Sequence, residues 1–181
     1  MLIGAGFAEL ACAGMRNPPP RWLAWSIGAV LAAGPDADII IGILRGRGGA
    51  YHGTFSHSLT AVAIIALMGY IAGGGRWAML GGLTYGSHLL VDLLDDSGPT
   101  NLMLGWPFTG ARPYSIGKLF PKVPVEGEGI VDTALNVLRP HSLINLLLQT
   151  LIAAVIFAAL LGIAAAIRRR RVRAGEPVAA G

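Results

Sequence analysis

The chain has 181 residues, of which 54% are hydrophobic and only 13% are charged, and its formal net charge is +4. This balance argues against an ordinary soluble domain and favours a single membrane-embedded domain. The one cysteine, Cys12, excludes an internal disulfide and a cysteine-rich metal cluster, and its apolar surroundings indicate a small packing residue.

Five apolar segments follow one another along the chain. The first is short for a span, because crossing the hydrocarbon layer takes about 20 residues. The second is interrupted at Gly34-Pro35, which predicts a broken helix there. The last is the clearest span, with about 25 residues and no charge. The segments are residues 2–15, 22–44, 57–72, 77–94 and 143–167.

These segments predict an all-α fold: a polytopic integral membrane bundle of four or five transmembrane segments with a long loop between the last two. Residues 95–141 are polar and contain several prolines and aromatics, so they are expected to form a loop or lid. Residues 1–167 are expected to form one membrane-embedded helical domain. Residues 168–181 are expected to form a basic, disordered cytoplasmic tail.

The arginine run at residues 168–173 directly follows the last apolar segment. We interpret it as a cytoplasmic stop-transfer anchor that touches anionic lipid headgroups, and not as a nucleic-acid-binding patch. The expected location is the inner or plasma membrane with a cytoplasmic C-terminus. This orientation puts Arg16, Arg21 and Arg76 inside, as the positive-inside rule favours, but Arg45 and Arg47 outside.

Metal-competent side chains lie in or beside these apolar segments. Each ionisable group in a bilayer costs roughly 2.5–3.5 kcal/mol, so such groups usually have a function. Carboxylates and imidazoles are ligands for a divalent ion such as zinc or manganese. Alternating spans would bring all of them to one side of the membrane, the extracytoplasmic side in this orientation. The sequence therefore predicts one metal site that is built from Asp36, Asp38, His52, His57, His88 and Asp92.

The histidines allow more than one interpretation. His88 and Asp92 are four residues apart, so on a helix they share a face, where they either bind one ion or form a polar pair. His52 and His57 would diverge on a straight helix. We therefore expect His52 in a loop and His57 in the first turn of the next helix, with Ser56 as its N-cap. Without a shared ion, the two would be interfacial histidines.

The carboxylates after Pro35 also allow more than one interpretation. Asp36 and Asp38 either cap the following helix, where acidic groups favour the helix dipole, or bind metal, or divide these roles. Asp95 and Asp96 are expected to be solvated, with Asp95 as a reserve ligand. Other polar and aromatic residues are assigned to the membrane interface: His141, Trp22, Trp25, Trp77, Trp106, Arg112, Lys118 and Lys122. An alternative role for Arg112, Lys118 and Lys122 is the attraction of an anionic headgroup.

Several short motifs occur in a recognisable order. They are Pro-Asp-Ala-Asp at 35–38, two histidines and a serine within 52–58, His-Leu-Leu-Val-Asp at 88–92, Ser-Gly-Pro-Thr at 97–100, Gly-Trp-Pro-Phe at 105–108 and Arg-Pro-Tyr-Ser at 112–115. In this order they resemble the predicted membrane-bound, metal-dependent hydrolase family. The resemblance covers roughly residues 30–116 and implies a divalent-metal site on a small helical membrane protein.

The chain departs from that family in two places. The usual His-Arg-Gly-x-Thr-His-Ser reads here as residues 52–58 without the arginine. The family also tends to begin with a histidine before a Leu-x-x-Gly stretch, whereas Leu2 here follows Met1 directly. One hypothesis is a native start upstream of Met1, which would supply a further ligand.

The function expected from this set is hydrolysis of a lipid or other amphipathic phosphoester or ester. One or two divalent ions, zinc or manganese, would activate a water by lowering its pKa to about 7, with Asp38 or Asp36 as general base. The expected partners are membrane lipids and a lipid-like substrate, with no nucleic acid. The main alternative is a metal-binding membrane protein without enzymatic activity, structural or for transport. A third interpretation makes the polar residues helix-packing partners only.

Overall fold

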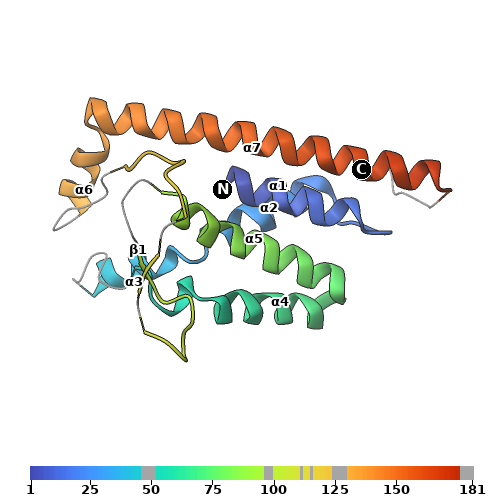
Figure 1. Ribbon diagram of the computed structural model, residues 1–181, viewed down its shortest axis with the longest axis horizontal. Helices are drawn as coiled ribbons and strands as arrows, with labels where there is room; N and C mark the ends of the chain where they lie inside the picture. Colours follow the sequence, from blue (N-terminus) through green and yellow to red (C-terminus); the bar gives the residue numbers. More distant parts are fainter. Residues whose placement is uncertain (46–51, 96–99, 111, 115, 124–129, 176–181) are drawn as a thin grey trace. The chain divides into compact units, whose positions relative to one another are not determined.

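The structure, a computed structural model, describes residues 1–45, 52–95, 100–110, 112–114, 116–123 and 130–175 (Figure 1). The chain divides into two compact units. Unit 1 comprises Met1–Ala33, Val62–His88 and Ala153–Gly181, and unit 2 comprises Gly34–Ala61 and Leu89–Ile152.

Most of the described chain is helical, and the prediction of a helical fold is confirmed. The elements in chain order are α1 (Leu2–Ala13), α2 (Arg21–Ala33), α3 (Ala37–Leu44), the 3₁₀ turn η2 (Phe55–His57), α4 (Leu59–Gly73), α5 (Gly75–Leu93), β1 (Thr100–Leu102), β2 (Arg112–Tyr114), α6 (Ile130–Val137) and α7 (Pro140–Arg173). β1 and β2 pair antiparallel, with Thr100 opposite Tyr114 and Leu102 opposite Arg112.

The prediction of a polytopic bundle with four or five spans is wrong for the described residues. Only α7, with 34 residues, is both long and apolar enough to cross a membrane. α1, α2 and α4 have 12, 13 and 15 residues, short of the roughly 20 that a span needs. α5 has 19 residues but carries polar side chains along its second half. The apolar runs were correctly located, but prolines and glycines cut them into shorter helices.

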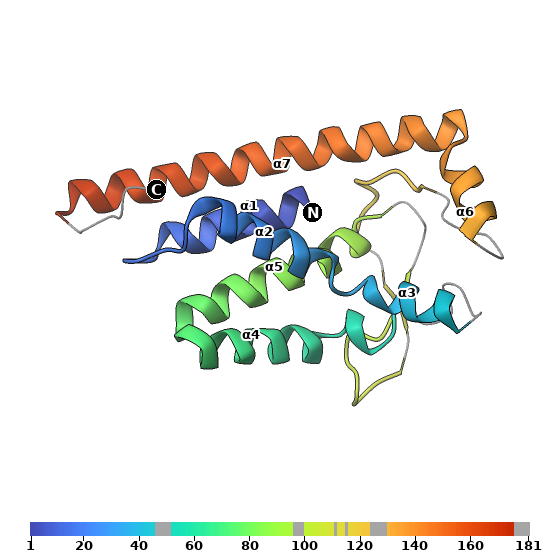
Figure 2. The same ribbon diagram turned by 180° about the vertical axis from the view of Figure 1, so that it is seen from behind.

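In unit 1, α1 and α2 lie side by side, as both ribbon views show (Figures 1 and 2). The turn between them contains Pro18, Pro19 and Pro20, which cannot continue a helix because proline has no backbone N–H. The two helices approach closely at glycines. A side-chain carbon on Gly28 would lie only 2.6 Å from the carbonyl oxygen of Gly4. Small residues thus let the backbones meet.

The core of unit 1 is built from small and medium side chains. It consists of Ala8, Ala11, Cys12, Met15, Ala24 and Leu80, with Ile27 and Leu31 packed against it. α4 and α5 form a second helix pair, joined at Gly74, whose φ of +80° suits glycine. The turn lies within three consecutive glycines, residues 73–75.

In unit 2, the region expected to be a loop or lid contains defined structure. Residues 95–141 include β1, β2 and α6. Asn145 and Gln149 of α7 donate hydrogen bonds of 2.7 Å to the carbonyl oxygens of Lys122 and Pro121. Side chains from the first turns of α7 therefore hold the segment that precedes α6.

α7 continues through the arginine run and ends at Arg173. The basic segment from Arg168 to Arg173, predicted as part of the tail, is thus helical. Residues 176–181 lie outside the described residues.

Candidate metal centre

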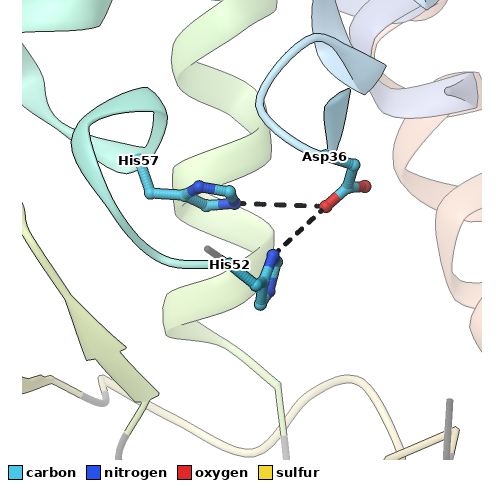
Figure 3. A group of neighbouring side chains, drawn as sticks. All are labelled: Asp36, His52 and His57. Carbon is cyan, nitrogen blue, oxygen red and sulfur yellow. Dashed lines mark ion pairs between the residues drawn. The ribbon is translucent and has the colours of Figure 1, made fainter. Parts of the chain in front are cut away.

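Unit 2 brings carboxylates and imidazoles together from separate segments. Asp36 lies in the turn before α3, His52 and His57 lie before and within η2, and Asp92 lies near the end of α5. Oδ1 of Asp36 is 3.7 Å from Nδ1 of His52 and 4.0 Å from Nε2 of His57 (Figure 3). Nε2 of His57 is also 3.5 Å from Oδ2 of Asp92. The imidazole of His57 is therefore the centre of the cluster.

The broken helix places the two carboxylates. After α2 ends at Ala33, the amides of Ala37, Asp38 and Ile39 donate to carbonyls three residues earlier, at 3.0 to 3.3 Å. α3 then begins at Ala37, so Asp36 lies just before the helix and Asp38 in its first turn. A carboxylate in the first turn is favoured by the helix dipole. The interruption predicted at Gly34-Pro35 is confirmed, and it separates the environments of the two aspartates.

Backbone turns likewise place His57. Gly53 has a φ of +79°, which turns the chain into η2, and the amide of His57 donates to the carbonyl of Thr54 at 2.9 Å. α4 begins only at Leu59, and the hydroxyl of Ser58 accepts a hydrogen bond of 3.0 Å from the amide of Ala61. The N-cap is therefore Ser58, and the prediction of Ser56 in this role is wrong. His57 lies before the helix and not in its first turn.

Ser56 instead supports the cluster from within. Its hydroxyl donates a hydrogen bond of 2.7 Å to Oδ2 of Asp38. The same oxygen is 3.2 Å from Nδ1 of His57, whose ring is fully buried. A carboxylate on Nδ1 fixes the tautomer and the orientation of an imidazole, and leaves Nε2 to carry the lone pair. Asp38 therefore aims Nε2 of His57 towards Asp36 and Asp92.

Burial raises the pKa of the Asp38 carboxyl group above its ordinary value. The negative charge of Asp36 acts in the same direction, whereas the hydrogen bond from Ser56 and the imidazole of His52 oppose it. The side chain of Asp38 is only 3% exposed, against 46% for Asp36. The two aspartates therefore differ in chemistry: one is shielded behind His57 and the other is open to solvent.

His88 lies in unit 1, one helical turn before Asp92 on α5. Its Nδ1 is 2.8 Å from the carbonyl oxygen of Ala32. A carbonyl only accepts hydrogen bonds, so Nδ1 carries the proton and Nε2 carries the lone pair. His57 and His88 thus share the tautomer that metal-binding histidines adopt when a neighbour holds their Nδ1–H.

The donor atoms of unit 2 have separations that suit a cation between them. A tetrahedral zinc site with bonds of about 2.0–2.1 Å holds its donor atoms about 3.3 Å apart. The 3.5 Å between Nε2 of His57 and Oδ2 of Asp92 is close to that value, and the 4.0 Å from Nε2 to Oδ1 of Asp36 is longer by less than 1 Å. Oδ1 of Asp38 is buried and lies 3.6 Å from Nδ1 of His52, so the carboxylate of Asp38 contacts both histidines. The residues therefore fit a divalent metal.

The remaining candidates are placed elsewhere. His141, in the first turn of α7, has its Nε2 3.2 Å from Nδ2 of Asn145 and is not part of a described metal-competent group. Asp95 forms a β-bridge with Phe120. Asp96 and parts of two motifs, residues 97–99 and Ser115, lie outside the described residues.

A buried carboxylate in unit 1 was not among the residues predicted from the sequence. Glu9 of α1 is 1% exposed and accepts a hydrogen bond of 2.6 Å from Trp25. Its Oε1 is 2.7 Å from Nη2 of Arg168 and 3.1 Å from Nη2 of Arg21. The signal was present in the sequence, because Glu9 is an ionisable residue within an apolar segment. Trp25, expected as an interfacial anchor, is a partner in this network.

Comparison with known proteins decides the family. A family model described as YdjM inner membrane protein matches residues 1–170. The chain belongs to the YdjM inner membrane protein family. No curated protein and no solved structure matches the chain.

Membership of the YdjM family confirms the predicted membrane location and assigns the chain to the inner membrane. The family description names a location and no reaction. The orientation in the membrane, the metal, the reaction and the resemblance to hydrolases stay predictions.

Proposed function

We propose that this inner membrane protein is a metal-dependent hydrolase that cleaves a phosphoester or ester of a lipid or other amphipathic substrate. The observation that carries the proposal is the arrangement of His57. Its Nδ1 lies 3.2 Å from the buried carboxylate of Asp38, and its Nε2 faces the carboxylates of Asp36 and Asp92. Metal-binding histidines are typically held in this way.

In this proposal His52, His57 and Asp92 of unit 2 hold the metal. His88 lies four residues before Asp92 on α5, and residues four apart on a helix share one face. Asp38 positions His57 and does not bind the ion, which revises the ligand set that the sequence predicts. A bound zinc or manganese ion would lower the pKa of a water to about 7 and polarise the oxygen of the scissile bond.

Asp36 is the carboxylate suited to accept the proton. Its side chain is 46% exposed, so it exchanges protons with solvent, while Asp38 is enclosed. Oδ1 of Asp36 lies within 4.0 Å of both His52 and His57, which places it beside the metal ligands.

The alternative is a structural ion without catalysis. Structural zinc sites are closed by four protein ligands, whereas catalytic sites keep an open position. Here one side of the cluster is buried, at His57 and Asp38, and the other is open, at His52 and Asp36, which are 35% and 46% exposed. This asymmetry favours catalysis.

Elemental analysis of the full chain purified in detergent tests the proposal. We expect near-stoichiometric zinc or manganese in the wild type, and its loss in His57→Ala and Asp92→Ala. The matched control is His141→Ala, which removes a histidine outside the cluster and should keep the metal. Asp36→Asn should keep the metal but lose hydrolysis of phosphoesters and esters. A wild type that stays metal-free after reconstitution with both ions would refute the proposal, and metal whose removal only unfolds the protein would favour the structural ion.

A further inference from the structure

Large apolar side chains project from the surface of unit 2 beside the cluster. We call them the apolar rim: Phe55, Leu59, Trp106 and Phe108, whose exposed fractions are 54%, 64%, 39% and 90%. Soluble surfaces rarely gather such side chains without a partner. Tryptophan is enriched at the lipid interface of membrane proteins, and tryptophan, phenylalanine and leucine form the buried face of helices that lie in the interface.

Backbone hydrogen bonds assemble the rim from two distant segments. The amide of Met103 donates to the carbonyl of Gly53, and the amide of Leu59 donates to the carbonyl of Leu104, both at 2.9 Å. The rings of Phe55 and Trp106 have centroids 6.1 Å apart. The rim is therefore a fixed feature of this loop pair and not a chance exposure of single residues.

The rim and the metal centre share one turn of chain. Phe55 begins η2 and His57 ends it, so they are two residues apart. The side chain of Phe55 is largely exposed, whereas the ring of His57 is fully buried. The turn thus presents an apolar surface outwards and a candidate ligand inwards.

Further contacts within unit 2 link the end of α5 to the start of α7, the helix that is long and apolar enough to cross a membrane. Asn145 and Gln149 lie five and nine residues after Pro140, which is about 7 and 14 Å along a helix axis. Both side chains hold the backbone of residues 121 and 122. The amide of Leu119 in turn donates to the carbonyl of Leu94 at 2.8 Å, just after α5 and two residues beyond Asp92.

This series of contacts runs from the first turns of α7 to the end of α5 that carries Asp92. On a helix about 30 Å of hydrocarbon is crossed in about 20 residues, so the first turns of a spanning helix lie near the headgroups. Most exposed side chains of α7 in this part are apolar, among them Leu143, Ile144 and Leu147, although His141 and Thr150 are exposed as well. Unit 2 is therefore continuous with a lipid-facing surface.

We infer that the apolar rim enters the lipid layer of the inner membrane, so that the site receives a phosphoester or ester at the headgroup of a bilayer lipid. The identity of the substrate rests on the proposed function, whereas the lipid contact does not. A water-soluble substrate would need no apolar surface beside the metal ligands. A bilayer lipid would reach them with its chains still in the membrane.

Lipid contact is measured by fluorescence quenching in the full chain. In a Cys12→Ser background, Phe108→Cys is labelled with bimane and reconstituted into phosphatidylcholine and phosphatidylglycerol vesicles that contain nitroxide-labelled lipid. We expect strong quenching by nitroxides placed just below the headgroup. Ala174→Cys, which lies after the arginine run, is the reference and should be quenched much less. Equal, weak quenching at both positions would overturn the inference, as would quenching that depends on protein concentration and not on the labelled lipid.

Turnover separates this inference from the proposed function. Phe55→Ser with Phe108→Ser should lower the ratio of turnover on vesicle lipid to turnover on bis-p-nitrophenyl phosphate by about tenfold or more, because a phenyl group in lipid is worth at least that factor in affinity. An unchanged ratio would overturn the lipid substrate. Quenching at Phe108 without metal or turnover would refute the hydrolase alone and leave the lipid contact established.

Discussion

Nδ1 of His57 lies 3.2 Å from Oδ2 of Asp38, and the hydroxyl of Ser56 donates a 2.7 Å hydrogen bond to the same oxygen. Nδ1 of His57 also lies 3.1 Å from the hydroxyl oxygen of Ser56. The carboxylate of Asp38 therefore contacts two adjacent side chains of η2 and holds the turn and the imidazole together.

This relationship predicts the effect of Asp38→Asn, which keeps the size of the side chain but can present its amide to His57. We expect zinc affinity to fall about 10- to 100-fold, the usual effect of removing a carboxylate behind a metal-bound histidine. The measurement is competition with a chromogenic chelator on detergent-purified protein, with Asp95→Asn as the matched control. Complete loss of metal would return Asp38 to the ligand set, and unchanged affinity would remove it from the site.

The arginine run offers a matched pair for stability. Arg168 lies 2.7 Å from the buried Glu9, whereas its neighbour Arg169 is exposed. We expect Arg168→Ala to lower the free energy of unfolding by about 2 kcal/mol, because it removes a partner of a buried charge. Arg169→Ala makes the same charge change and should have little effect. Thermal unfolding in detergent measures both, and equal losses would show that net charge matters and not the contact.

Glu9 should make stability depend on pH. Burial by itself raises the pKa of its carboxyl group, but the hydrogen bonds from Trp25 and Arg168 and the charges of both arginines outweigh it, so the pKa is lowered from the ordinary 4.5. A lowered folded-state pKa stabilises the fold above 4.5, and this stabilisation is lost as the pH falls through the folded-state value.

The test is the difference in unfolding temperature between neutral and acidic pH. Glu9→Gln should have a lower unfolding temperature than the wild type at neutral pH, and its unfolding temperature should fall less on acidification. An identical acid loss in wild type and Glu9→Gln would assign the pH dependence to other groups.

The close approach of α1 and α2 predicts a second matched pair. A side-chain carbon at Gly28 would lie 2.6 Å from the carbonyl oxygen of Gly4. A side-chain carbon at Gly162 of α7 would have no such neighbouring atom within 4 Å. Gly28→Ala should therefore cost about 1–3 kcal/mol, as overpacking does. Gly162→Ala should be neutral or slightly stabilising, because alanine favours helix. Similar melting temperatures for the two variants would contradict the close packing.

Cys12 should be chemically inert in the folded protein. Burial, together with the negative charge of Glu9, raises the pKa of its thiol to about 11, so little thiolate forms near neutral pH. We expect maleimide to label the folded protein slowly and the denatured protein completely, as mass spectrometry would show. Rapid labelling of the folded protein would indicate that the α1–α2 core opens readily.

The sequence by itself located the apolar runs, the break at Gly34-Pro35 and the metal-competent side chains. Composition sufficed for the membrane location, which the family confirms, because hydrophobic content depends on residue types alone. Helical spacing likewise put His88 and Asp92 on one face of α5. These are local properties, which need no knowledge of distant contacts.

Only the tertiary structure decided how those residues are used. It placed Asp38 behind His57, at the ring nitrogen that does not face Asp36 and Asp92. It also joined Glu9 to Arg168, which is 159 residues away in the chain. Such pairings depend on which backbones approach each other, and the approach is set by packing at small residues such as Gly28. No local pattern carries that information.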